Sequence, residues 1–227
     1  MSFQKTELNF DQYIKDKTIA LVGNSESLFF NDNTGCEIDD HDIVIRINRP
    51  AIFYDNRDSD QSHGRRMDVW AFWDHGFFVA KVDPSKNPPM LNRALEIENF
   101  NVLNMRQQMT RRSFKFNDHF IGVDRYDLLD KYTTPGAVTY RNFSTGMYII
   151  AMINEFSFKE LNLYGFDWKR SPTFNEADTH LQNIIHGSRR FDIRCCHEYQ
   201  NEEEIAFKYF LSQDRINLKG QFWLHDS

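Results

Sequence analysis

A turn behind a short apolar run is the first place in this sequence where residue types point to chemistry. The run Thr18–Val22 leads directly into Gly23, Asn24 and Ser25. Glycine lets a backbone approach a ligand closely, and an asparagine side chain both donates and accepts hydrogen bonds, which suits a base or a ribose. A helix starting after the turn would offer free N–H groups to an anion. Many α/β proteins carry such a turn without a ligand, so the turn alone leaves both interpretations open.

A second stretch, residues 106–115, combines positive charges with aromatic side chains. Arg106, Arg111 and Arg112 stand close to Phe114. One interpretation is an ordinary solvated surface. The other is an acceptor site, because cations and aromatic rings together suit a charged glycan or flipped-out DNA bases.

The sequence offers little for a metal ion. Asp58 and Asp60 form the kind of acidic pair with which metal-dependent transferases hold Mg²⁺ or Mn²⁺. The pair falls in the polar stretch Asn56–Arg66, which we expect to be a loop, and short acidic pairs are common on surfaces. The three cysteines have no zinc-site spacing, with Cys195 and Cys196 adjacent. We therefore expect no metal and no other cofactor.

The glycine turn also opens a longer pattern. Val22–Ser25 are followed by Gly35 and then by the run Ile38–Asn48. This set resembles the long sialyl motif of the animal-type sialyltransferases. Asp40 stands where that family commonly has a serine.

Two shorter patterns follow in the order that the same family has. Ser144–Met147, then an apolar stretch, then Leu163–Phe166 resemble the short sialyl motif. His197 and Glu202, with four residues between them, resemble the very short motif. Part of the short motif is also similar to the small soluble bacterial sialyltransferases. Three ordered matches over most of the chain are more specific than any single one.

The resemblance implies a role for each matched position. His197 would be the general base that takes the proton of the acceptor hydroxyl, a step worth about 10²–10⁴ in rate. Glu202 would orient the neighbouring helix or polarise the site. His186 is favoured over His180 for contact with the donor phosphate. The other matched positions would hold a cytidine nucleotide: Gly23, Asn24, Ser25, Asn48, Ser144, Thr145 and Gly146.

Three functions are carried forward. The resemblance implies an inverting, metal-independent glycosyltransferase that moves a sugar from a CMP-sialic acid-like donor to an acceptor hydroxyl, usually of a glycan. A second hypothesis is a viral DNA-modifying glycosyltransferase on the same scaffold, with a UDP-sugar donor and a hydroxymethylated base as acceptor. A third is a non-catalytic nucleotide- or glycan-binding protein, which the presence of both His197 and Glu202 disfavours.

The elements that must position these residues alternate along the chain. Such alternation indicates an α/β fold, expected as one Rossmann-like domain over residues 1–227, with a mainly parallel sheet and helices on both faces. The resemblance implies the sialyltransferase variant of the GT-A type. The ligand should lie at the carboxyl ends of the strands, below a lid from Pro84–Pro89 or Ser171–Gly187. Expected strands are Thr18–Val22, Asp42–Asn48, Met67–Trp73, Asn101–Asn104 and Leu161–Gly165; expected helices are Asp124–Tyr132, Thr145–Glu155 and Glu202–Leu211.

Charge and hydropathy limit the remaining choices. A net charge of −6 over 227 residues counts against a dedicated nucleic-acid binder. No apolar run approaches the roughly 20 residues that a membrane span needs, and no apolar leader follows Met1. We expect a cytoplasmic protein, bacterial or in a virus-infected host. The disulfide of the animal enzymes would be absent, because Cys36 has no cysteine near Ser144 to pair with. His41 and Arg46 are interpreted as structural, through a hydrogen bond and an ion pair.

Overall fold

The computed structural model describes residues 10–25, 28, 34–47, 60–72, 101–104, 131–132, 144–166 and 200–219. Within these ranges one parallel sheet has the strand order β4-β3-β2-β1-β5-β6. The five predicted strands are confirmed, and a further strand, β6, was not anticipated. The strands are β1 (Thr18–Val22), β2 (Ile43–Ile47), β3 (Val69–Phe72), β4 (Asn101–Asn104), β5 (Glu160–Tyr164) and β6 (Ile216–Lys219).

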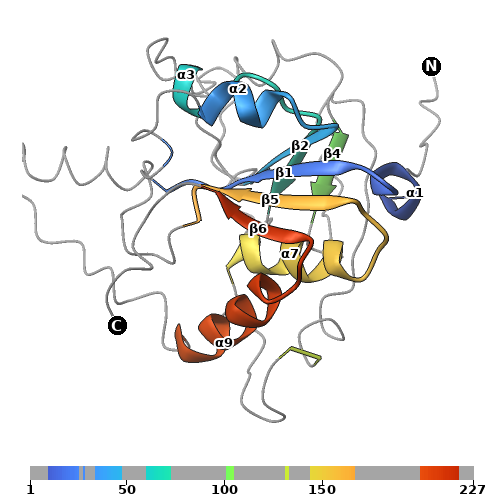
Figure 1. Ribbon diagram of the computed structural model, residues 1–227, viewed down its shortest axis with the longest axis vertical. Helices are drawn as coiled ribbons and strands as arrows, with labels where there is room; N and C mark the ends of the chain where they lie inside the picture. The colour runs from blue at the N-terminus through green and yellow to red at the C-terminus, as the bar shows by residue number, and fades with distance from the viewer. Residues whose placement is uncertain are drawn as a thin grey trace, which may run out of the picture.

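Helices cover both faces of this sheet, as predicted (Figure 1). The helices α2 (Thr34–Asp39) and α3 (Asp60–His63) lie on one face. The helices α7 (Thr145–Asn154) and α9 (Gln200–Leu211) lie on the other. A short α1 (Phe10–Ile14) precedes β1. The result is the three-layered α/β architecture that the alternating pattern indicated.

The central strands are apolar on both sides because each face is covered by a helix. In β1, Ile19 and Leu21 pack in the core on the α7 side, whereas Ala20 and Val22 pack on the α2 side. Residues 146–153 of α7 are all buried. The helical spacing of Met147, Ile150, Ala151 and Asn154 predicts a single apolar face, which is narrower than the buried surface of α7, because α7 lies between the sheet and α9 (Figure 1).

The buried face of α9 differs from the predicted one. The helical spacing of Ile205, Ala206, Tyr209 and Phe210 predicts that these four residues share it, but Ile205 and Tyr209 are exposed. The buried residues are Ala206, Phe207 and Phe210, which are spaced three and four apart and so lie on one side of the helix. The sequence pattern did not distinguish these two neighbouring faces, since both carry apolar residues.

His41 is held at the junction of α2 and β2 by hydrogen bonds, which confirms its structural interpretation. Its Nδ1 lies 2.8 Å from the carbonyl oxygen of Glu37 and its Nε2 lies 2.8 Å from Nδ2 of Asn162. The carbonyl can only accept, so the Nδ1 atom carries the proton and Nε2 accepts from the amide. This side chain links α2 to β5.

Arg46 is fully buried beneath α2 and α3, and its predicted ion pair is confirmed. Nη2 lies 3.8 Å from Oδ1 of Asp39 and donates to the His63 carbonyl at 2.8 Å, while Nε donates to the Arg66 carbonyl at 2.7 Å. Burial lowers the pKa of Arg46 to about 10, although the negative charge of Asp39 acts to raise it. Asp39 also accepts from the backbone N–H groups of Arg65 and Arg66. Together they fix the connection between α3 and β3.

The polar stretch Asn56–Arg66 was predicted to be a loop, and this prediction is wrong for residues 60–63, which form α3. Buried Arg46 binds the carbonyl oxygen at the end of this helical turn, so a tertiary contact stabilises a segment without an apolar pattern. Asp58 lies outside the described residues. So do both predicted lid segments and most of the predicted helix Asp124–Tyr132, whose last two positions form a turn.

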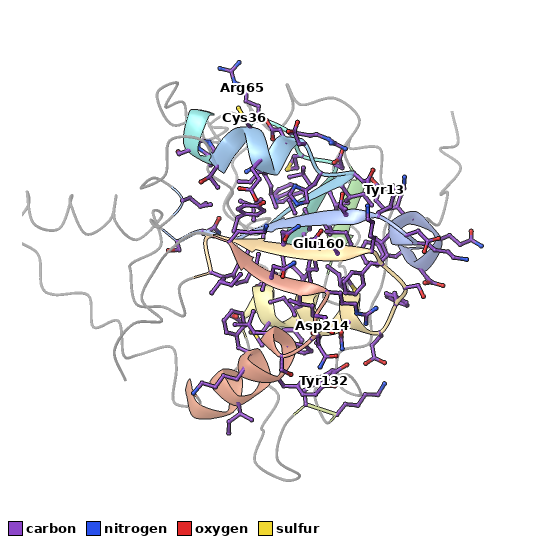
Figure 2. The ribbon with its side chains drawn as sticks, in the orientation of Figure 1. Tyr13, Cys36, Arg65, Tyr132, Glu160 and Asp214 are labelled. Atoms are coloured by element: carbon purple, nitrogen blue, oxygen red, sulfur yellow. The ribbon has the colours of Figure 1, made fainter. Side chains whose placement is uncertain are left out.

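Cys36 is a free cysteine on the exposed side of α2 (Figure 2). Among the described helices, none combines the length and the apolar character that crossing a bilayer requires.

Replacing Arg46 with leucine tests the buried polar centre. We expect Arg46→Leu to lower the free energy of unfolding by about 3 kcal/mol, because the carbonyls of His63 and Arg66 and the Asp39 carboxylate lose their shared partner. The matched control is the exposed neighbour Arg65, whose replacement by leucine should change stability by no more than about 0.5 kcal/mol. Urea denaturation measures both. Equal effects of the two substitutions would contradict this account.

Candidate functional site

The order of the strands marks one point where a ligand site is expected. From β1 the chain proceeds outward through β2, β3 and β4, and then returns to β5 on the other side of β1. In open parallel sheets, ligands bind beyond the carboxyl ends of the strands at such a reversal. Val22 and Tyr164, the last residues of β1 and β5, are register partners. Gly23–Ser25 and Gly165–Phe166 therefore leave the sheet side by side, at the left in Figure 1.

The two chain segments remain hydrogen-bonded after the strands end. Gly23 N–H donates to the Tyr164 carbonyl at 2.7 Å, and Ser25 N–H donates to the Gly165 carbonyl at 3.3 Å. A Cβ atom at residue 23 would lie 2.4 Å from the Gly165 carbonyl oxygen. Glycine at position 23 is thus required by the backbone opposite it, whether or not a ligand is bound.

Phe166 connects this turn to the start of α7. Its ring lies 3.2 Å from the Cβ position of Gly23 and 2.6 Å from that of Gly146. Gly165 has a φ of +67°, which is the left-handed region that glycine tolerates best. We call Gly23, Gly146, Gly165 and Phe166 the glycine junction. It joins β1, β5 and α7 at the carboxyl edge of the sheet.

The N-terminus of α7 is capped at this junction. Ser144 is the N-cap, and its hydroxyl accepts from the backbone N–H of Met147 at 3.4 Å. Thr145 opens the helix. Because Gly146 lacks a side chain, Phe166 packs directly against the first turn of the helix. The ring of Phe166 therefore contacts both predicted halves of the site, the Gly-Asn-Ser turn at Gly23 and the Ser-Thr-Gly segment at Gly146.

Asn24 carries an open hydrogen-bonding group at this edge. Its Nδ2 donates to the carbonyl of Ile47, the last residue of β2, at 3.2 Å. That bond assigns the amide orientation and leaves Oδ1 buried with no hydrogen-bond partner among the residues that the structure describes. The side chain is 8% exposed. A buried acceptor of this kind is costly to leave unpaired, so it favours a ligand that donates a hydrogen bond.

The predicted site residues divide into three groups. Gly23, Asn24 and Ser25 lie at the same edge as Ser144, Thr145 and Gly146. Glu202 lies in the first turn of α9, which precedes β6 just as α7 precedes β5. Outside the described residues are Asn48, His186, His197, Arg106, Arg111 and Arg112.

The helix expected after the glycine turn falls on residues 26–33, of which only Leu28 belongs to the described part of the chain, so that expectation stays a prediction. Gly165 and Phe166 were recognised as part of a motif but received no role, although they hold the two halves together. A glycine directly after a predicted strand was the available signal, since the same signal had identified Gly23.

Tyr164 connects the junction to α2. Its hydroxyl donates to Oε1 of Glu37 at 2.8 Å, and Nζ of Lys219 lies 3.4 Å from the same oxygen. Burial, reinforced by the hydrogen bond to Glu37, raises the pKa of Tyr164. Tyr164 therefore acts as a neutral hydrogen-bond donor at neutral pH.

No family model matches the chain, and no curated protein matches it. Solved structures do match. A mammalian sialyltransferase superposes with a TM-score of 0.54 at 13% identity, covering 92% of this chain and 71% of the other. A mammalian sialyltransferase in complex with Gal-beta-1-3GalNAc-ortho-nitrophenol superposes with a TM-score of 0.50 at 14% identity, covering 92% of this chain and 71% of the other. The sialyltransferase Cst-II variant in complex with CMP superposes with a TM-score of 0.51 at 18% identity, covering 89% of this chain and 80% of the other.

At these levels of sequence identity, the superpositions show the fold alone. The chain has a sialyltransferase-like fold. At the level of architecture, this confirms the family resemblance that the three motifs indicated.

The contact between Gly146 and Phe166 can be tested by a pair of substitutions. Gly146→Ala should destabilise the protein by about 1–3 kcal/mol through overpacking, because its Cβ would lie 2.6 Å from the Phe166 ring. Adding Phe166→Leu removes the ring atoms and should recover about 1 kcal/mol or more relative to additivity. Thermal or urea unfolding of the single and double variants measures the coupling.

Gly23→Ala provides the matched control for that pair. Its new Cβ would meet the backbone carbonyl of Gly165, which a change of Phe166 cannot move away. Phe166→Leu should therefore give little recovery in the Gly23→Ala background. Additive effects in both backgrounds would show that Phe166 does not join the two halves.

Proposed function

We propose that this chain is an inverting, metal-independent glycosyltransferase that transfers a sugar from a CMP-sialic acid-like donor to the hydroxyl of a glycan. The observation that carries the proposal is the glycine junction: the Gly23–Ser25 turn and the Ser144–Gly146 helix start meet at the switch point of the sheet. The fold is shared with a sialyltransferase solved in complex with CMP and with another solved in complex with Gal-beta-1-3GalNAc-ortho-nitrophenol. These two bound molecules support a nucleotide donor and a glycan acceptor here.

The nucleotide would lie across the junction. Asn24 supplies an unpaired acceptor oxygen, which suits a ribose hydroxyl or an exocyclic amino group. The first turn of α7 supplies backbone N–H groups at the positive end of a helix, which favours an anion. Ser25 and Thr145 add hydroxyl groups at the same edge. Asn48 and His186 complete the proposed donor contacts from the sequence motifs.

The chemistry would be a single displacement. The acceptor hydroxyl gives its proton to His197 as its oxygen forms a bond to the anomeric carbon. The bond between that carbon and the phosphate oxygen breaks, and CMP leaves with the electron pair. Attack opposite the leaving group inverts the anomeric centre. The leaving monophosphate is stabilised by hydrogen-bond donors, so the proposal assigns no metal ion.

His197 stands three residues before Gln200, where α9 begins. A helix that connects parallel strands runs against them, so α9 starts at the carboxyl edge. This placement of α9 supports a base at the same edge as the junction, and it puts Glu202 in the turn that follows. The acceptor contacts assigned to Arg106, Arg111 and Arg112 are a proposal from sequence alone.

A donor screen tests the nucleotide. The protein is incubated with CMP- and UDP-sugars, and thermal shift and donor hydrolysis are measured. CMP-sugars should raise the melting temperature and be slowly hydrolysed. A shift with UDP-sugars alone would overturn the CMP assignment and favour the DNA-modifying alternative, which a gel shift with hydroxymethylated DNA then examines.

Separate variants distinguish binding from chemistry. His197→Ala should lower the transfer rate by about 10²–10⁴ while changing donor affinity by less than about twofold, since the base acts on the acceptor. Asn24→Ala should weaken donor binding, because it removes a donor contact, and should therefore slow transfer at subsaturating donor. At saturating donor its transfer rate should stay close to that of the wild type. Undiminished turnover by His197→Ala would exclude this residue as the base. Donor binding without any turnover in the wild-type protein would indicate the non-catalytic alternative.

A further inference from the structure

The carboxyl edge of the sheet, where the strands end and the glycine junction lies, carries few positive charges. Within the part of the chain that the structure describes, Arg46 is near this edge but is fully buried and bonded to carbonyls. Arg65 and Arg66 lie in the connection between α3 and β3, where their backbone N–H groups bind Asp39. The other described cations lie toward the opposite edge, because they come directly before a strand, occupy the last turn of α9 or pair with Glu155 at the end of α7. They are Lys15, Lys17, Lys131, Lys159, Lys208 and Arg215.

Lys219 is the exception among the described residues. It is the last residue of β6, and its side chain is 36% exposed. Its Cα is the register partner of Tyr164, the residue before Gly165 of the junction. Neighbouring strands are about 5 Å apart, so Lys219 lies two strands, or about 10 Å, from the end of β1. A nucleotide sugar that lies across the junction extends over that distance.

The ammonium group of Lys219 is held in position. Its Nζ lies 3.4 Å from Oε1 of Glu37, and the same oxygen accepts from the buried Tyr164 hydroxyl at 2.8 Å. Glu37 is therefore fixed from two sides, by β5 and by β6. An ammonium group has three N–H donors, and one carboxylate oxygen takes one of them. The others can bind a second oxyanion at little additional cost in side-chain entropy.

We propose that Lys219 is a specificity-determining residue that binds an oxyanion of the donor, with Glu37 and Tyr164 as its positioning residues. This inference rests on the proposed function, because it needs a nucleotide-sugar donor at the junction. The oxyanion can belong to the nucleotide phosphate or to a sugar carboxylate. Both are oxygen anions that a lysine recognises as a point charge.

Calorimetric titration of the folded full-length protein tests the proposal. Cytidine, CMP and CMP-sialic acid are titrated into the wild-type protein, Lys219→Gln and Lys219→Arg. Lys219→Gln should bind CMP or CMP-sialic acid about tenfold more weakly and cytidine unchanged, while Lys219→Arg retains most of the affinity. A loss for CMP identifies the phosphate, and a loss for CMP-sialic acid alone identifies the sugar carboxylate.

Lys131→Gln is the matched control. Lys131 forms a similar partly exposed ion pair with Glu155, beyond the C-terminus of α7 at the opposite edge. This variant should bind all three ligands as the wild type does, and both glutamine variants should have similar melting temperatures.

Two results would overturn the role of Lys219. One is unchanged affinity of Lys219→Gln for both anionic ligands. The other is an equal loss of cytidine affinity, which would indicate a general structural effect. Failure of the wild-type protein to bind any of the three ligands would instead refute the nucleotide donor itself, and the role of Lys219 with it, before any variant is compared.

Discussion

The close packing of two backbones at the end of β1 and β5 is the constraint on which the rest of the edge depends. Gly23 has no room for a side chain because the Gly165 carbonyl lies where its Cβ would be. Gly165 in turn adopts a positive φ, which directs Phe166 toward the first turn of α7. Without these two glycines, the turn after β1 and the start of α7 would be separated, and Asn24 would not reach the end of β2.

The α2 face of the sheet holds that edge in place by a different means. Here buried polar groups add to a smaller apolar cluster. Arg46 binds the connection before β3, and His41 joins α2 to Asn162 of β5. Asn162 accepts from Asn217 of β6, and Tyr164 reaches Glu37. Buried polar networks of this kind are directional, so they fix the position of α2 over the strands more narrowly than apolar contacts would.

The sequence predicted β1, β2 and β5 well because each is a short, mainly apolar run bounded by turn residues, and burial on both faces requires that composition. β6 was missed because Ile216–Lys219 alternates apolar and polar residues over only four positions at the edge of the described sheet. The residues of the site were found as motifs, but Phe166 received no role: its contacts with Gly23 and Gly146 are tertiary, and no spacing encodes them. The helix α3 was missed for the same reason, because Arg46 of β2 stabilises it through a tertiary hydrogen bond.

The topology explains why motifs so far apart in the sequence belong to one edge. The first covers the end of β1 and the unit α2–β2. The second covers the start of α7 and the end of β5. The third ends in the first turn of α9, which leads into β6. Each crossover helix returns the chain to the start of the next parallel strand, so strand ends and helix starts alternate at the same edge. The donor site proposed at the ends of β1 and β5 therefore draws on a strand end and a helix start at once, and the start of α9 lies at the same edge of the sheet.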